Sequence, residues 1–194
     1  VLQGLMAGTR EMIKNQRPDR TLKDVFDSVF YANLGIQEAD YRPIFADFYA
    51  RVYPHLRSLA DPNPDAQAFL SQVWERGYRV VIATNPLFPL TAIQQRVEWA
   101  GVPANSHSVD LIPSYESMHF AKPHPAYFAE LLGILGWPEG PVVMVGDDLE
   151  NDIHPARQLD LAAYWIHPHP ASVDKNDPLG ASSAGELSSL LEWI

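Results

Sequence analysis

Four carboxylates lie within six positions of the sequence, directly after the short apolar run at residues 142–145. They belong to Asp147, Asp148, Glu150 and Asp152. Like charges crowded in this way repel one another, so a cation is their natural compensation. Mg²⁺ favours such oxygen ligands, and it binds through one or two carboxylates while it keeps several waters. The cluster therefore indicates either a magnesium site or an acidic helix start, where carboxylates favour the helix dipole.

Two further segments carry polar side chains with a related chemistry. Thr84 and Asn85 follow the apolar run at 78–83, and Lys122 precedes Pro123 and a helical pattern. Taken alone, a threonine at a strand end usually caps the next turn, and most lysines are solvated. Taken together with a metal-binding carboxylate pair, a hydroxyl and an ammonium supply what a dianionic phosphoryl group requires: neutralised charge, hydrogen-bond donors and a bridging metal.

These side chains lie in a chain whose helical and apolar segments alternate from about residue 59 onward. Strands are predicted at 78–83, 109–112, 142–145 and 162–166, with helices in the intervals at about 63–77, 91–100, 125–135 and 153–159. Repeated strand–helix–strand units require right-handed crossovers and produce a parallel sheet between helices. In such sheets, functional side chains gather at the carboxyl ends of the strands, where the candidates above are found.

Residues 1–58 show helical patterns only. Thr21 and Asp24 resemble a capping pair at the start of one amphipathic helix. A second helix is predicted at about 38–52, and Pro54 is predicted to close the region. The apolar stripe of the second helix consists of Ile44, Phe45, Phe48, Tyr49 and Val52.

Three segments together resemble motifs of the haloacid dehalogenase superfamily in order, spacing and strand context. Thr84-Asn85 is similar to the second motif, Lys122-Pro123 to the third, and Gly146-Asp147-Asp148-x-x-Asn151-Asp152 to the fourth. The resemblance implies an α/β fold with two parts. Residues 59–194 resemble the Rossmann-like parallel-sheet core, here lacking its usual first strand, and residues 1–58 resemble an all-helical cap.

The resemblance also implies roles for individual residues. Thr84, Lys122 and Asp147 would be catalytic, and Thr84, Asn85 and Lys122 would bind the substrate. Asp147 and Asp152 would hold Mg²⁺, with Asp147 the more direct ligand, while Asp148 and Asn151 would cap the turn or support the ligands. In such enzymes a carboxylate attacks phosphorus, and water then hydrolyses the aspartyl-phosphate.

The chain departs from the family in its first motif, Asp-x-Asp, which supplies the nucleophile and the acid/base and does not occur among these 194 residues. Two hypotheses follow. The chain is a truncated Mg²⁺-dependent phosphomonoester hydrolase for a small soluble phosphorylated metabolite, or a catalytically silent relic that binds metal, phosphate or a protein partner. Without a first strand, the inner strands would pair directly, exchange a segment within a homo-oligomer, or pair with a strand from upstream of Val1.

The composition argues against two classes of binding partner, nucleic acids and membranes. The net charge is −10, from 24 acidic and 14 basic residues without a basic patch, which argues against nucleic acid. The apolar runs are too short to span a bilayer, so no membrane partner is expected. There is no cysteine, which excludes disulfides and fits a cytoplasmic location. Prolines around His167 and His169 favour a surface loop over a metal site.

Overall fold

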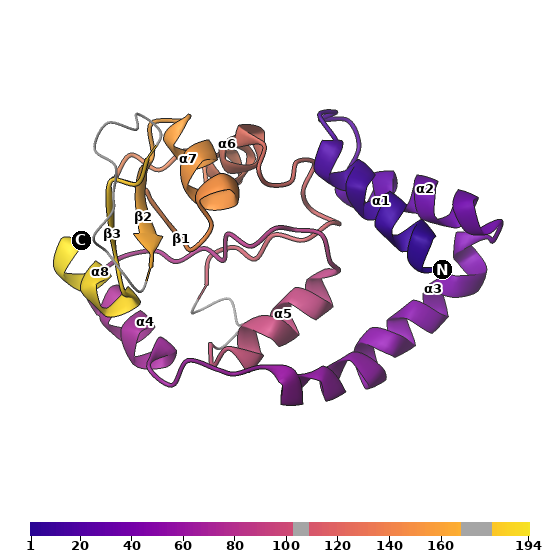
Figure 1. The fold of residues 1–194 in the computed structure, drawn as a ribbon, viewed down its shortest axis with the longest axis horizontal. Coiled ribbons are helices and arrows are strands. Elements are labelled where there is room, and N and C mark those ends of the chain that lie inside the picture. Colours follow the sequence, from indigo (N-terminus) through magenta and orange to yellow (C-terminus); the bar gives the residue numbers. More distant parts are fainter. Residues whose placement is uncertain (103–108, 168–179) are drawn as a thin grey trace. The chain divides into compact units, whose positions relative to one another are not determined.

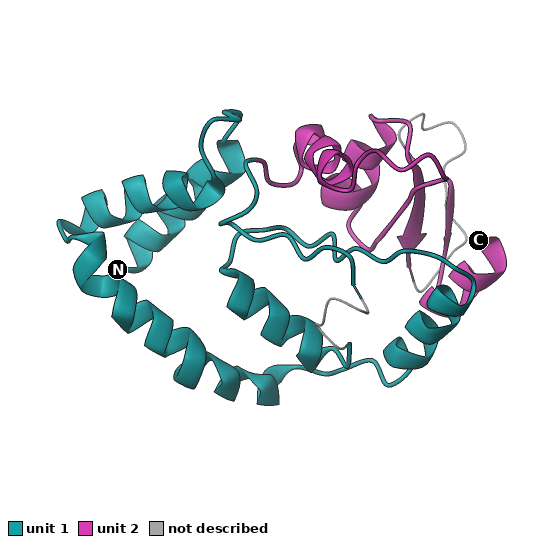
Figure 2. Cartoon of the chain, turned by 180° about the vertical axis from the view of Figure 1, so that it is seen from behind, with its two compact units in different colours: residues 1–119 teal, residues 120–194 magenta. Residues whose placement is uncertain are grey.

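The computed structural model describes residues 1–102, 109–167 and 180–194. The chain forms two compact units, residues 1–119 and 120–194 (Figure 2). This division lies further along the chain than the predicted boundary between a cap at 1–58 and a core at 59–194, which stays a prediction. Within the described ranges, no helix is both long enough and apolar enough to cross a membrane.

The first unit is mainly helical (Figure 1). Thr21 caps α2 as predicted: its Oγ1 accepts the N–H of Asp24 at 3.1 Å, and the carboxylate of Asp24 accepts the N–H of Thr21 at 3.0 Å. Gly8 lets α1 approach α2 closely, because a Cβ there would lie 2.7 Å from the ring of Phe26. The helices are α1 (Leu2–Lys14), α2 (Leu22–Leu34), α3 (Glu38–Asp47), the π-helical turn η1 (Phe48–Val52), the 3₁₀ helix η2 (Tyr53–Leu59), α4 (Ala66–Glu75) and α5 (Leu90–Trp99).

The helix predicted at 38–52 is present as α3 continued by η1, but its apolar stripe is largely exposed. Ile44 is 57% exposed and Val52 is 51% exposed. Pro54 does not close the region. It lies in the first turn of η2, where a proline is tolerated because the N–H that it lacks would have no helical partner.

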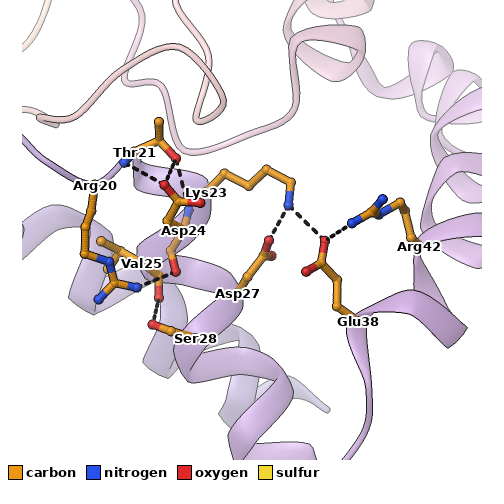
Figure 3. A network of polar contacts seen from close by, with 9 residues as sticks. All are labelled: Arg20, Thr21, Lys23, Asp24, Val25, Asp27, Ser28, Glu38 and Arg42. Atoms are coloured by element: carbon orange, nitrogen blue, oxygen red, sulfur yellow. Dashed lines mark hydrogen bonds and ion pairs between the residues drawn. The ribbon is translucent and has the colours of Figure 1, made fainter.

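An ion-pair network joins α2 to the start of α3 (Figure 3). The Lys23 ammonium contacts the carboxylate of Asp27 and donates to Glu38 at 3.1 Å. Arg42 donates to the same Glu38 carboxylate at 2.8 Å. Burial raises the pKa of Asp27, and the hydrogen bond from Lys23 opposes this rise. The network fixes α3 against α2 at one point along the chain.

The strands predicted at 78–83 and 109–112 lie side by side in parallel, but they form a single bridge rather than a long ladder. Val81 pairs with Leu111, the N–H of Ile82 donates to the Leu111 carbonyl at 3.0 Å, and the N–H of Asp110 donates to the Val80 carbonyl at 2.8 Å. This pair packs on the apolar face of α5. The buried members of that cluster are Ile93, Val97, Val102 and Val109, with Ile82 and Ile112 partly buried against them.

The second unit contains a three-stranded parallel sheet in the order β1-β2-β3, which confirms the predicted α/β class. The register places Val143 beside Ala162 and Gly146 beside Trp165. The strand β3 and the helix α8 were not predicted. The elements are α6 (Pro125–Ile134), β1 (Val143–Gly146), the π-helical turn η3 (Leu149–Ile153), α7 (His154–Arg157), β2 (Ala162–Ile166), β3 (Ser183–Gly185) and α8 (Leu187–Trp193).

Candidate functional site

The acid-rich turn follows β1 directly and leads into η3. Asp148 caps this helical turn: its Oδ1 accepts the N–H groups of Glu150 at 2.9 Å and Asn151 at 3.0 Å. The side-chain amide of Asn151 donates to the other oxygen of Asp148 at 2.7 Å. These bonds, first of all the one from the Asn151 side chain, lower the pKa of Asp148. Asp148 therefore caps the turn, which is one of the two roles predicted for it, and Asn151 supports the capping carboxylate through its side-chain amide.

Lys122 and Asp152 form a buried ion pair. They are 5% and 7% exposed, and the ammonium contacts Oδ1 of the carboxylate. The second oxygen of Asp152 accepts the N–H of Asp148 at 3.3 Å. The ammonium also lies 5.6 Å from the ring centroid of Tyr127 and 5.8 Å from that of Phe128, within cation–π range. Two charges held away from water interact more strongly than they would at the surface.

Gly146 provides the space that Asp152 occupies. A Cβ at position 146 would lie 2.5 Å from Cγ and 2.6 Å from Cβ of Asp152, closer than such atoms approach in proteins. The carboxylate therefore packs directly on the backbone of the last residue of β1. Only glycine at this position lets Asp152 lie there and contact Lys122 at the same time.

Asp147 is exposed, and within the described part of the chain its carboxylate has no hydrogen bond or ion pair. Its main-chain carbonyl accepts the indole N–H of Trp165 at 3.0 Å. No group of three or more metal-binding side chains lies together among the described residues. Because Mg²⁺ binds through one or two carboxylates and keeps its waters, the free oxygens of Asp147, with Asp152 in the same turn, fit its donor chemistry.

Thr84 and Asn85 are half-buried and belong to the first unit, just after the extended segment at 78–83. The N–H of Leu87 donates to the Asn85 carbonyl at 2.9 Å. The turn is then anchored at its far end, because the N–H of Leu90 donates to the carboxylate of Glu116 at 3.1 Å. Lys122, Asp147 and Asp152 are thus placed in one unit around one turn. That Thr84 and Asn85 act with them stays a prediction.

Trp165 is the residue near the turn that the sequence analysis missed. No local pattern in the sequence identifies it, because its place beside Gly146 depends on the parallel register of β2 with β1. The ring of His167 packs on this indole with 4.3 Å between ring centroids, and the backbone N–H of His167 donates to the Gly185 carbonyl at 3.0 Å. His167 thus extends the pairing of β2 with β3, while His169 lies outside the described residues.

A short parallel sheet with an acid-rich turn beside a buried lysine is the arrangement of one class of hydrolases. The profile of haloacid dehalogenase-like hydrolases matches residues 3–160, and the chain belongs to this family. A phosphoserine phosphatase of Thermus thermophilus is 27% identical over 131 residues, which cover 68% of this chain. The matched segment spans about half the length of that relative, 51% of its residues.

Solved structures show the same fold at low sequence identity. A HAD phosphatase from Thermococcus onnurineus is 19% identical with a TM-score of 0.57, and the match covers 99% of this chain and 88% of that one. An L-2-haloacid dehalogenase from Xanthobacter autotrophicus is 15% identical with a TM-score of 0.56, and the match covers 98% of this chain and 83% of that one. Phosphatases and dehalogenases therefore share this architecture, so the fold alone does not determine which reaction a member catalyses. That depends on the side chains at the site.

Proposed function

We propose that the chain provides the substrate- and metal-binding side of a Mg²⁺-dependent phosphomonoester hydrolase for a small soluble phosphorylated metabolite. The observation that carries the proposal is the buried Lys122–Asp152 pair beside the exposed carboxylate of Asp147. Displacement of halide needs no metal, so the acid-rich turn favours phosphate as the group that is acted on. The relative named as a phosphoserine phosphatase supports the same choice.

Each residue has a definite part in this proposal. The Lys122 ammonium neutralises a phosphoryl oxygen, and its burial strengthens that interaction because little water competes. Thr84 and Asn85 donate hydrogen bonds to the remaining phosphoryl oxygens. Asp147 and Asp152 hold Mg²⁺, which when bound polarises the phosphoryl group and neutralises charge that develops on it. Asp152 also keeps the ammonium in place between substrates.

The attacking carboxylate is not assigned to a residue of this chain, because no Asp-x-Asp triplet occurs among the 194 residues. The proposal includes a segment carrying that triplet. Its first carboxylate attacks phosphorus, the alkoxide leaves with a proton from the second, and water then releases inorganic phosphate from the aspartyl-phosphate. The same observation supports the second candidate, a silent relic that binds Mg²⁺ or phosphate without turnover.

Phosphate release from p-nitrophenyl phosphate and from phosphoserine, with and without Mg²⁺, tests the proposal. The 194-residue chain alone should hydrolyse both little above background, and fusion of a first strand bearing Asp-x-Asp should restore Mg²⁺-dependent turnover. In the fused protein, Lys122→Met should abolish turnover. Lys14→Met is the matched control, because that side chain is 68% exposed.

Two results would decide against the hydrolase. A folded fusion protein that binds Mg²⁺ but releases no phosphate supports the silent relic. Turnover that survives Lys122→Met unchanged contradicts the role of the buried ion pair, since removal of the ammonium leaves the carboxylate of Asp152 without its partner.

A further inference from the structure

The peptide group between Asp147 and Asp148 is held from both sides. Its carbonyl oxygen accepts the indole N–H of Trp165 at 3.0 Å, and its N–H donates to the carboxylate of Asp152 at 3.3 Å. A peptide group is planar, so bonds to its carbonyl and to its N–H together fix one plane. That plane restricts the backbone torsion ψ of Asp147, and with it the direction in which the Cα–Cβ bond of Asp147 leaves the backbone.

The indole that makes one of these bonds is itself fixed by the sheet. Trp165 is a neighbour of Gly146 in the parallel register, so its backbone is tied to the last residue of β1. Its ring packs against the ring of His167, and the backbone of His167 is bonded to Gly185 in β3. The carbonyl of Asp147 is thus attached to all three strands through one side chain.

We propose that Trp165 is a positioning residue for Asp147, which it holds in the orientation that receives the metal. This inference rests on the proposed role of Asp147 as a Mg²⁺ ligand. Without the indole N–H, the 147–148 peptide keeps only its bond to Asp152, and the carboxylate of Asp147 samples more directions. Mg²⁺ must then order it on binding, which weakens affinity. Partners that orient metal ligands typically change metal affinity by about 10–100-fold.

Calorimetric titration of the chain with Mg²⁺ tests this directly. Trp165→Phe keeps a smaller aromatic ring at this position and removes the five-membered ring that carries the N–H donor, and it should weaken Mg²⁺ binding about tenfold. Trp137→Phe is the matched control in the same unit, because Trp137 is 62% exposed, and it should bind as the wild type does. Asp147→Asn should remove binding.

The variants separate failure of the positioning role from failure of the metal site. If Asp147→Asn removes binding while Trp165→Phe binds like the wild type, the positioning role is overturned and the ligand role stands. If Asp147→Asn binds Mg²⁺ as well as the wild type, the ligand role fails and the inference falls with it. A lower melting temperature of Trp165→Phe with unchanged Mg²⁺ affinity would show a purely structural side chain, which also overturns the inference.

A measurement on the wild type keeps the test independent of whether Trp165→Phe folds. The chain has five tryptophans, and each has one indole N–H for magnetic resonance. One of these signals should shift as Mg²⁺ is added, and its shift should be absent in Asp147→Asn. A titration that saturates the site and moves none of the five signals would overturn the inference.

Discussion

Gly146→Ala adds one methyl group at the position where the structure leaves no space for it. The new Cβ would meet Cγ and Cβ of Asp152 at 2.5 and 2.6 Å. Position 146 is in a β-strand, where alanine is sterically allowed, so the effect of the substitution comes from this contact and not from backbone strain. Either β1 or the carboxylate of Asp152 must move.

The size of the effect depends on which of the two moves. Overpacking of a filled interior costs about 1–3 kcal/mol of unfolding free energy. If Asp152 moves far enough to separate from Lys122, the cost approaches that of breaking a buried ion pair, about 3–5 kcal/mol. The backbone of β1 is held in register by β2, whereas the carboxylate of Asp152 is at the end of a rotatable side chain. We therefore expect the carboxylate to move, and the cost to be that of breaking the buried ion pair. Total stabilities of only about 5–15 kcal/mol make this a severe change.

Urea unfolding followed by circular dichroism measures the change. Gly140→Ala is the matched control, since a Cβ there would meet nothing within 4 Å, and it should unfold at the wild-type midpoint. The Gly146→Ala midpoint should be clearly lower, with an unchanged slope, and Mg²⁺ should no longer stabilise the variant. Equal midpoints for Gly146→Ala and Gly140→Ala would refute the argument that glycine is required here to admit Asp152.

Two further predictions concern the first unit. Gly8→Ala should lower the thermal midpoint, because a Cβ 2.7 Å from Phe26 overpacks α1 on α2. Gly4→Ala is the matched comparison, since the nearest neighbour of its new Cβ lies at 3.5 Å, and it should raise the midpoint through helix propensity. Shifts of the two midpoints in the same direction would contradict this prediction. Burial, and then the nearby Tyr53, raise the pKa of Tyr49 to about 12. Between pH of about 10 and 12 the unfolded chain therefore binds fewer protons than the folded one, so stability should fall as pH rises through this window, and urea midpoints of Tyr49→Phe should fall less steeply.

The parts of the fold that the sequence could predict are those that depend on neighbouring residues. The cap of α2 needs only Thr21 and Asp24, and the cap of η3 needs only Asp148 and the residues that follow it. The cap of α2 is predicted from the sequence because an oxygen acceptor two or three residues before unpaired N–H groups is enough to define it, whereas the capping role of Asp148 is one of two roles that the family resemblance implies. The acid-rich turn after β1 is also visible in the sequence, because its four carboxylates lie within six positions directly after an apolar run.

Features that depend on partners far along the chain could not be predicted in this way. The sequence predicts a full strand at 78–83, but the structure has a single bridge there, between Val81 and Leu111. The number of paired residues in a β-ladder depends on the partner strand as well as on the segment itself. The bond from Trp165 to Asp147 depends on the register of two strands, which no local pattern defines. The stripe at Ile44 and Val52 shows that helical spacing of apolar residues predicts a helix without predicting what covers it.

The spacing of the acid-rich motif has a physical explanation in this structure. The N–H of Asp152 donates to the Asp148 carbonyl at 2.8 Å, so the two residues are separated by one helical turn. Side chains on a helix tilt toward its N-terminus, which brings the carboxylate of Asp152 back to the N-terminal end of that turn. There it meets the N–H of Asp148, the backbone of Gly146 and the ammonium of Lys122. One residue more or fewer in the turn would rotate this carboxylate by about 100° and separate it from all three, so the spacing and the residue types depend on each other.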